Sequence, residues 1–213
     1  DESITSYYEN RMIDAIGGGM FEKMDSLKYK SFAKALSIDR MPDNFLTKFS
    51  IIMQQRLNLQ QAMSSKSEDL TWTNYYAMLY AKGPIAWKWL ENAIGIEVFD
   101  KSMQTFYERF AFKHFEAKDL ETVFEEVSGK DLKWFFEGIA NSSTNQELKL
   151  KKVKKLEATN VITISNNTDF TLPIPGSYTS KSIQVDSTIW LEVQPGTNTY
   201  TIPARNTSDL LAI

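Results

Sequence analysis

The stretch Asn141-Ser-Ser-Thr-Asn-Gln146 separates two parts of the chain that have different hydrophobic patterns. Up to about residue 142, apolar side chains recur at the spacing of a helix. After about residue 147, short β-branched and aromatic runs alternate with Asn, Pro, Gly and Ser. The stretch itself is polar and aperiodic, which is typical of a connection between domains. The sequence therefore predicts an α+β protein, with a mainly helical domain at residues 1–142 and an antiparallel β-sandwich domain at residues 147–213.

At least six helices are expected in the first part. The first one should end at the run Gly17 to Gly19, where backbone freedom disfavours further helix. Another should begin at Pro84, whose fixed φ suits a first helical turn, and a later one should be capped by Asp119. The apolar spacing places the helices at about 3–16, 45–57, 84–95, 99–110, 119–127 and 132–136.

Strands are expected throughout the second part. Pro173 and Pro175 should confine their strand to a sheet edge or a strand end, because proline cannot donate to the ladder. The lysine-rich stretch 149–155 reads as an exposed strand that its charges protect against edge pairing. The final run 209–213 stops within apolar sequence, so we expect a truncated sandwich. The other predicted strands are 161–165, 170–174, 182–185, 188–193 and 199–202.

The composition excludes several classes of function. The net charge is only -3, with acidic and basic residues mixed along the chain, which argues against a nucleic-acid or anionic-membrane partner. The chain has no cysteine and one histidine, His114, so it cannot form thiolate sites or a multi-histidine metal site by itself. For His114 we expect a surface or helix-end role. No apolar run approaches the roughly 20 residues of a membrane helix, so no membrane span is expected. The absence of cysteine is compatible with both cytoplasmic and exported proteins.

Two segments resemble a known family of enzymes. Residues 1–10, Asp-Glu-Ser-Ile-Thr-Ser-Tyr-Tyr-Glu-Asn, resemble the helix start that holds the glutamate zinc ligand in aminopeptidase N-type zinc metallopeptidases, which are gluzincins. Residues 79–83, Leu-Tyr-Ala-Lys-Gly, resemble the Tyr-x-Lys-Gly element of the same family. The resemblance covers roughly residues 1–140 and is weaker in the β segment. Its further points are 90–95, 106–110, 119–132, 135–136, 166–170 and 172–175.

The resemblance implies a fold and a set of roles. Residues 1–142 would be the C-terminal half of a thermolysin-like catalytic domain, followed by the family's β-sandwich. Glu2 would be the third zinc ligand, and Tyr80 would donate a hydrogen bond to the tetrahedral oxyanion, although the sequence leaves open whether Tyr75 or Tyr76 is the reactive tyrosine instead. Ser3 stands where the family usually has glycine. The H-E-x-x-H that supplies two histidines and the general base does not occur in this sequence.

Several expectations follow for activity, cofactor and partners. The complete enzyme would use zinc to hydrolyse peptides at their N-terminus, whereas this chain alone would bind no catalytic zinc and would be inactive. Its helices would expose an apolar surface, so self-association is expected. The resemblance favours an extracytoplasmic location. The alternatives are a non-catalytic pseudo-peptidase scaffold that binds a peptide or protein, and a helical interaction domain fused to an adhesion-like sandwich. In these alternatives Glu2 is an acidic residue near a helix N-terminus and Tyr80 is a packing residue.

Overall fold

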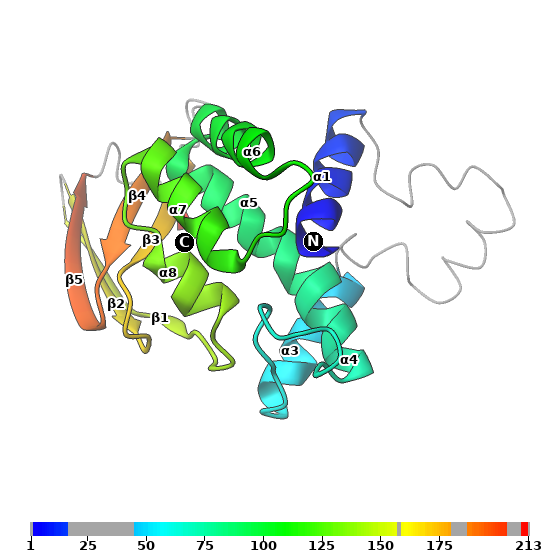
Figure 1. Ribbon diagram of the computed structural model, residues 1–213. Helices are drawn as coiled ribbons and strands as arrows, with labels where there is room; N and C mark the ends of the chain where they lie inside the picture. Colours follow the sequence, from blue (N-terminus) through cyan, green and yellow to red (C-terminus); the bar gives the residue numbers. More distant parts are fainter. Residues whose placement is uncertain (1, 17–44, 157–158, 180–186, 204–209, 213) are drawn as a thin grey trace, which may run out of the picture. The chain divides into compact units, whose positions relative to one another are not determined.

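The computed structural model describes residues 2–16, 45–156, 159–179, 187–203 and 210–212. Helices come first along the chain and strands follow from Leu148 onward, so the α+β class is confirmed (Figure 1). The chain forms two compact units, Asp1–Leu90 with Ala140–Ser143, and Glu91–Ile139 with Thr144–Ile213. These units are groups of residues in mutual contact and do not test the domain boundary that we predicted between residues 142 and 147, so this boundary stays a prediction.

The helices of the first unit pack around a segment of π-helix. This segment, η2 (Tyr75–Lys82), contacts both α1 (Glu2–Ala15) and α3 (Phe45–Arg56). The core at these contacts includes the fully buried side chains of Tyr7 and Met78. The first two predicted helices are therefore confirmed, while the glycine run at 17–19 lies outside the described residues.

The helix predicted at 84–95 is observed, but it forms the last part of one long helical run. This run consists of α4 (Trp72–Asn74), η2 and α5 (Gly83–Ile94), which follow one another without a break. Proline disrupts an α-helix because it lacks an N–H and its ring crowds the preceding turn. Here the turn before Pro84 is wound as a π-helix, and the Gly83 N–H bonds to the Met78 carbonyl five residues earlier. The bounds of α5 therefore agree with the predicted helix to within one residue, but Pro84 does not start it from non-helical chain, because the wider turn accommodates the proline inside the helical run.

The helices that follow α5 are α6 (Ile96–Phe110), α7 (Ala117–Ser128), α8 (Lys133–Phe135) and the π-helical η3 (Phe136–Ala140). Phe99 of α6 meets Phe124 of α7 edge to face, with 5.4 Å between ring centroids. The prediction that Asp119 caps α7 was wrong by one turn. The capping residue is Glu116, and Asp119 Oδ2 accepts the Glu116 backbone N–H at 2.8 Å, which forms a capping box.

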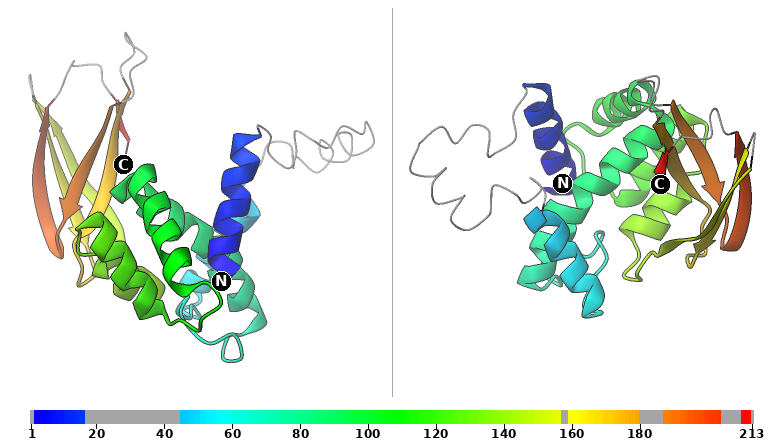
Figure 2. Two further views of the ribbon diagram at one scale, coloured as in Figure 1. Left: turned by 45° about the horizontal axis from the view of Figure 1, so that its top comes forward. Right: turned by 180° about the vertical axis from the view of Figure 1, so that it is seen from behind.

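Among the residues that the structure describes, the strands form two antiparallel three-stranded sheets in the orders β1-β2-β5 and β4-β3-β6. Contacts between β2 and β4 join the sheets, and Figure 2 shows the strands as two adjoining layers, as predicted for a β-sandwich. The core between the layers includes Ile162, Leu172, Val193 and Ile202. The strand bounds are β1 (Leu148–Lys155), β2 (Thr159–Asn166), β3 (Leu172–Thr179), β4 (Ser187–Val193), β5 (Gly196–Pro203) and β6 (Leu210–Ala212).

Proline and lysine lie where a strand has a partner on one side only. β6 pairs with β3 only from Ser177 to Thr179, so Pro173 and Pro175 lie where β3 pairs with β4 alone among the described strands. β1 is an edge strand whose residues after Leu148 are all exposed, which agrees with the prediction for the lysine-rich stretch. The predicted strand at 182–185 lies outside the described residues.

Within the described residues, no helix combines the length and the apolar character that crossing a bilayer requires.

Candidate functional site

The carboxylate of Glu2 accepts hydrogen bonds from two tyrosine hydroxyls of η2. Tyr80 donates to Oε2 at 2.9 Å, and Tyr75 donates to Oε1 at 3.2 Å. Glu2 is the first residue of α1, and 78 positions of sequence separate it from Tyr80. The structure therefore brings together the two residues to which the resemblance assigns roles, while the roles themselves stay predictions.

The π-helical winding of η2 explains why both tyrosines reach the same carboxylate. In an α-helix, side chains five positions apart point in directions that differ by about 140°, so they do not share a face. In a π-helix, hydrogen bonds join residues five positions apart and place one above the other. The rings of Tyr75 and Tyr80 accordingly lie with their centroids 5.8 Å apart. Winding α4 directly into α5 as a regular α-helix would separate them.

The three neighbouring tyrosines contribute in different ways. Tyr75 and Tyr80 both present their hydroxyls to Glu2, whereas the Tyr76 ring stacks on the Tyr80 ring at 6.4 Å between centroids. The sequence alone left open which tyrosine is reactive, because the spacing of Tyr75 and Tyr80 indicates a shared face only if the helix is known to be a π-helix. The sequence therefore did not predict that Tyr75 is a second hydrogen-bond donor to Glu2.

The hydrogen bond to Glu2 keeps Tyr80 protonated. This bond, followed by the interaction with Tyr75, raises the pKa of the Tyr80 hydroxyl to about 12. The side chain is nevertheless 40% exposed, so its hydroxyl borders solvent. A phenol in this state is a hydrogen-bond donor throughout the neutral pH range.

Lys82 completes the Tyr-x-Lys-Gly element as a buried cation. The residue is only 8% exposed, and desolvation lowers its pKa from 10.5 to about 8. Since burial disfavours the charged form, Lys82 is held at some energetic cost in the same π-helix that carries the tyrosines.

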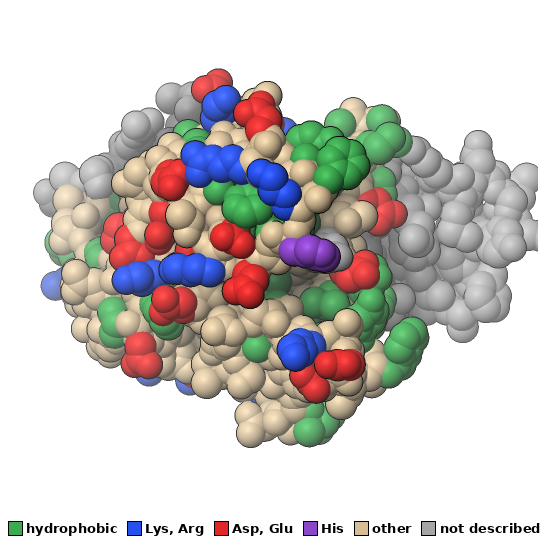
Figure 3. Space-filling view, in the orientation of Figure 1, with side chains coloured by type: hydrophobic (Ala, Val, Ile, Leu, Met, Phe, Trp, Pro, Cys, Tyr) green, Lys and Arg blue, Asp and Glu red, His purple; other side chains and the backbone are tan. Residues whose placement is uncertain are grey.

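The described residues do not complete a zinc site. Protein zinc sites take three or four ligands from His, Cys, Asp and Glu. The chain has a single histidine, His114, which lies exposed between α6 and α7. Acidic and basic side chains are intermingled on the face of the molecule that Figure 3 shows. No group of three or more metal-ligating side chains occurs in the parts of the chain that the structure describes. Glu2 therefore fits as one ligand of a site that needs others.

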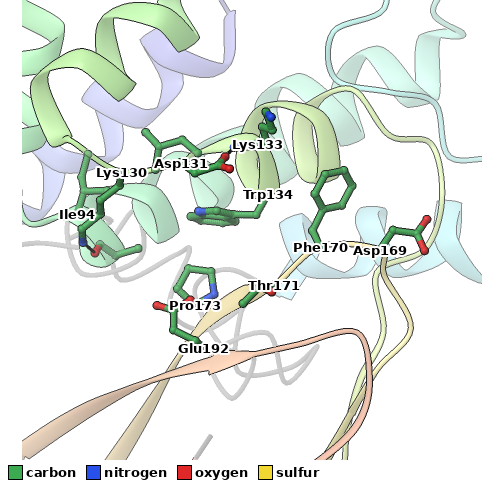
Figure 4. A pocket seen from close by; sticks show the side chains of 12 residues that line it. Ile94, Lys130, Asp131, Lys133, Trp134, Asp169, Phe170, Thr171, Pro173 and Glu192 are labelled. Atoms are coloured by element: carbon green, nitrogen blue, oxygen red, sulfur yellow. Dashed lines mark hydrogen bonds between the residues drawn. The ribbon is translucent and has the colours of Figure 1, made fainter.

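A cavity of about 590 Å³ lies in the second unit (Figure 4). Trp134, Phe170 and Pro173 give it apolar walls, and Asp169 and Glu192 add carboxylates. Neither Glu2 nor the tyrosines of η2 line it. No sequence motif predicted this cavity.

Comparisons with known proteins agree with the resemblance read from the sequence. Residues 1–139 match the family model described as Peptidase family M1 domain. The chain is 40% identical over 60 residues to Aminopeptidase N of Streptomyces lividans, an alignment that covers 28% of this chain and 7% of that protein. Its fold is similar to that of Legionella pneumophila aminopeptidase A, solved in complex with aspartic acid, with a TM-score of 0.52 and 20% identity. This second match covers 65% of our chain and 17% of the solved one, so the chain spans a small part of either relative.

Proposed function

Because the chain belongs to peptidase family M1, we propose that the full-length protein is a zinc-dependent aminopeptidase that removes residues from the N-terminus of peptides. The observation that carries this proposal is the meeting of Glu2 with the hydroxyls of Tyr80 and Tyr75. A carboxylate at the start of one helix and a protonated phenol on another are the groups that this chain would contribute to such a site.

Glu2 is the proposed zinc ligand of this chain. Two histidines of an H-E-x-x-H motif, which these 213 residues do not contain, would complete the site. A bound zinc ion would lower the pKa of a water molecule and polarise the scissile carbonyl. The proposal agrees with the partly exposed position of Glu2, which leaves its carboxylate accessible to a metal ion that other ligands would also bind.

Tyr80 is the proposed donor to the oxyanion. Its raised pKa means that the hydroxyl gives up no proton at neutral pH and acts by donating a hydrogen bond. Such a donor stabilises the oxygen of the substrate carbonyl most strongly when that oxygen gains negative charge. Tyr75 would be a second hydroxyl next to it, and would help to hold the carboxylate of Glu2 in one orientation.

The isolated chain should be inactive under this proposal. It supplies one proposed metal ligand and contains neither the histidine pair nor the glutamate that would act as general base. The purified 213-residue chain should therefore show no hydrolysis above background with added zinc.

The experiment measures zinc and activity together in the full-length protein. The zinc content after dialysis and the cleavage of an aminoacyl-p-nitroanilide should both be lost in Glu2→Gln. The same substitution at Glu9, an exposed residue of α1, should retain both. An N-acetylated substrate should resist cleavage, because an aminopeptidase requires a free amino group. A wild-type protein that binds peptide yet retains no zinc would refute the proposal and favour a pseudo-peptidase scaffold.

A further inference from the structure

We infer that Gly83 and Trp87 are positioning residues for Glu2, because they hold the first turn of α1 against the junction between η2 and α5. The inference deepens the proposed function and rests on it for its catalytic consequence. It concerns residues that would touch neither substrate nor metal, and that act through Ser3, the neighbour of Glu2 in the chain.

Gly83 allows the two helices to approach closely. A Cβ atom at position 83 would lie 2.3 Å from Cβ of Ser3 and 3.1 Å from its Cα. Cβ atoms in proteins do not come within 3.0 Å of such neighbours, so any larger residue would force α1 away. The backbone of Gly83 is helical, with φ -53, and so the glycine serves the close approach rather than an unusual backbone conformation.

Trp87 fixes the same turn from the next turn of α5. Its indole is buried, and Nε1 donates to Ser3 Oγ at 3.2 Å. Burying an indole N–H is unfavourable without an acceptor, so the pair favours one position of Ser3. Gly83 thus sets how closely α1 approaches, and Trp87 sets where Ser3 lies.

This contact controls the site because both of its sides are next to site residues along the chain. Ser3 follows Glu2 directly, and Gly83 follows the π-helix that carries Tyr75 and Tyr80. The hydrogen bonds at 2.9 and 3.2 Å have little room to lengthen, since bonds weaken steeply beyond the usual distances. A displacement of about 1 Å at Ser3 would therefore separate the carboxylate from both hydroxyls.

The test is a cycle of substitutions in the full-length protein. Gly83→Ala should lower zinc affinity, measured by competition with a chelator, by about 10- to 100-fold, as changes in residues that orient metal ligands do. The kcat should fall in parallel while KM changes little. Adding Ser3→Gly removes the contact at 2.3 Å and leaves an approach of 3.1 Å to Cα, which a shift of a few tenths of an ångström relieves. Ser3→Gly also deletes the acceptor of the Trp87 indole N–H, so this variant alone should bind zinc somewhat more weakly than the wild type. The double variant should bind zinc more tightly than Gly83→Ala and within about twofold of Ser3→Gly, and a double variant as weak as Gly83→Ala would overturn the inference.

Gly138→Ala is the matched control. A Cβ there would lie 2.8 Å from the Phe170 ring, so this variant also creates a steric clash, but in the other unit. It should lower the melting temperature while leaving zinc affinity and kcat unchanged, and Ser3→Gly should not rescue it. A loss of zinc in Gly138→Ala equal to that in Gly83→Ala would mean that general destabilisation explains the effect, and would overturn the inference.

A crystal structure of the Gly83→Ala variant separates this inference from the proposed function. The Glu2 carboxylate should lie beyond hydrogen-bond distance of Tyr80 in this structure, whether or not the protein binds zinc. A carboxylate that stays at about 2.9 Å from the hydroxyl overturns the inference even if the wild type is an active zinc enzyme. A displaced carboxylate in a protein without zinc would sustain the inference about position and refute the aminopeptidase instead.

Discussion

At the scale of single residues, Tyr80 is the group whose removal tests the proposed chemistry most directly. Tyr80→Phe deletes the hydroxyl that donates to Glu2 and keeps the ring that stacks on Tyr76. In the full-length protein we expect kcat to fall roughly 10² to 10³-fold, which is the usual loss for an oxyanion donor. The zinc content should be unchanged, because Tyr75 still donates to Glu2 and the backbone of α1 keeps its place. Steady-state kinetics and metal analysis would measure the two quantities.

The neighbouring tyrosines are the controls for this prediction. Tyr76→Phe should leave kcat nearly unchanged, because its ring stacks on Tyr80 and the ring is retained. Tyr75→Phe should have an effect smaller than that of Tyr80→Phe, since its hydroxyl would orient Glu2 rather than meet the substrate. Should Tyr75→Phe abolish turnover while Tyr80→Phe does not, the roles of the two tyrosines would have to be exchanged.

The lowered pKa of Lys82 predicts that the free energy of unfolding rises with pH. Unfolded lysine keeps its proton up to about pH 10.5, whereas folded Lys82 releases it near pH 8, so unfolding takes up a proton between these values. The free energy of unfolding should therefore increase across this range, by on the order of 2 kcal/mol relative to Lys82→Met. Above pH 10 the raised pKa of Tyr80 has the opposite effect. Folded Tyr80 then holds a proton that the unfolded chain releases, so its contribution to the free energy of unfolding falls as pH rises.

Urea denaturation of the wild type and of Lys82→Met at several pH values would measure this difference. Lys101→Met, which replaces an exposed lysine of α6, should follow the wild-type dependence. Parallel curves for the wild type and Lys82→Met between pH 8 and 10 would show that the folded protein does not depress the pKa of Lys82.

At the scale of elements, α7 begins with a capping box that can be removed by one substitution. Asp119→Ala deletes the acceptor of the Glu116 N–H, and it should cost about 1 kcal/mol of the free energy of unfolding. Thr122→Ala, one turn later on an exposed position, should cost nothing or stabilise slightly, because alanine favours helix. Chemical denaturation would check both values, and equal stability of the two variants would rule out the capping box as a source of stability.

The helices and most strands were predictable because their apolar spacing matches the surface that they bury. Phe99 and Phe124, for example, lie on faces that the 3.6-residue period identifies, and both are buried. The Asp119 cap was misplaced because Glu116 and Asp119 share the capping box, so either acidic residue can be read as the start of the helix. The helix predicted from Pro84 matches α5, whereas the helical run before it was not predicted, because local rules for proline assume an α-helix.

The candidate site was predictable only in part, because the sequence does not show how its helices pack or which of them is a π-helix. The resemblance named Glu2 and Tyr80 separately, since a motif fixes residue types and order along the chain. Their contact depends on the packing of α1 against η2, and the second donor, Tyr75, depends on the π-helical register. Neither register nor helix packing leaves a period in the hydrophobic pattern, so these features had to come from the structure.

At the scale of the whole molecule, exposed apolar side chains on the helices of the first unit predict self-association of the 213-residue chain. Ile52 of α3 is 49% exposed and Met12 of α1 is 67% exposed, and further exposed apolar residues accompany them on both helices. Burial of apolar surface between copies stabilises association by roughly 25 cal/mol per Å² before the entropic costs. Sedimentation velocity should show species larger than a monomer at micromolar concentrations.

Ile52→Lys should reduce this association by placing a charge within the apolar surface. Gln104→Lys adds the same charge at an exposed polar position of α6 and should leave association unchanged. A wild-type chain that sediments as a single monomeric species would contradict the prediction, and the exposed side chains would then be ordinary surface residues.

The winding of η2 has a consequence for which changes of length the chain tolerates. Loss of one residue between Tyr75 and Tyr80 would leave the tyrosines four positions apart, a spacing that shares a face in an ordinary α-helix. Gain of one residue would leave them six apart, a spacing that matches neither type of helix. Variants of this protein should therefore keep their activity after a one-residue deletion in the segment more often than after a one-residue insertion. A library of one-codon insertions and deletions, screened for activity, would show this asymmetry.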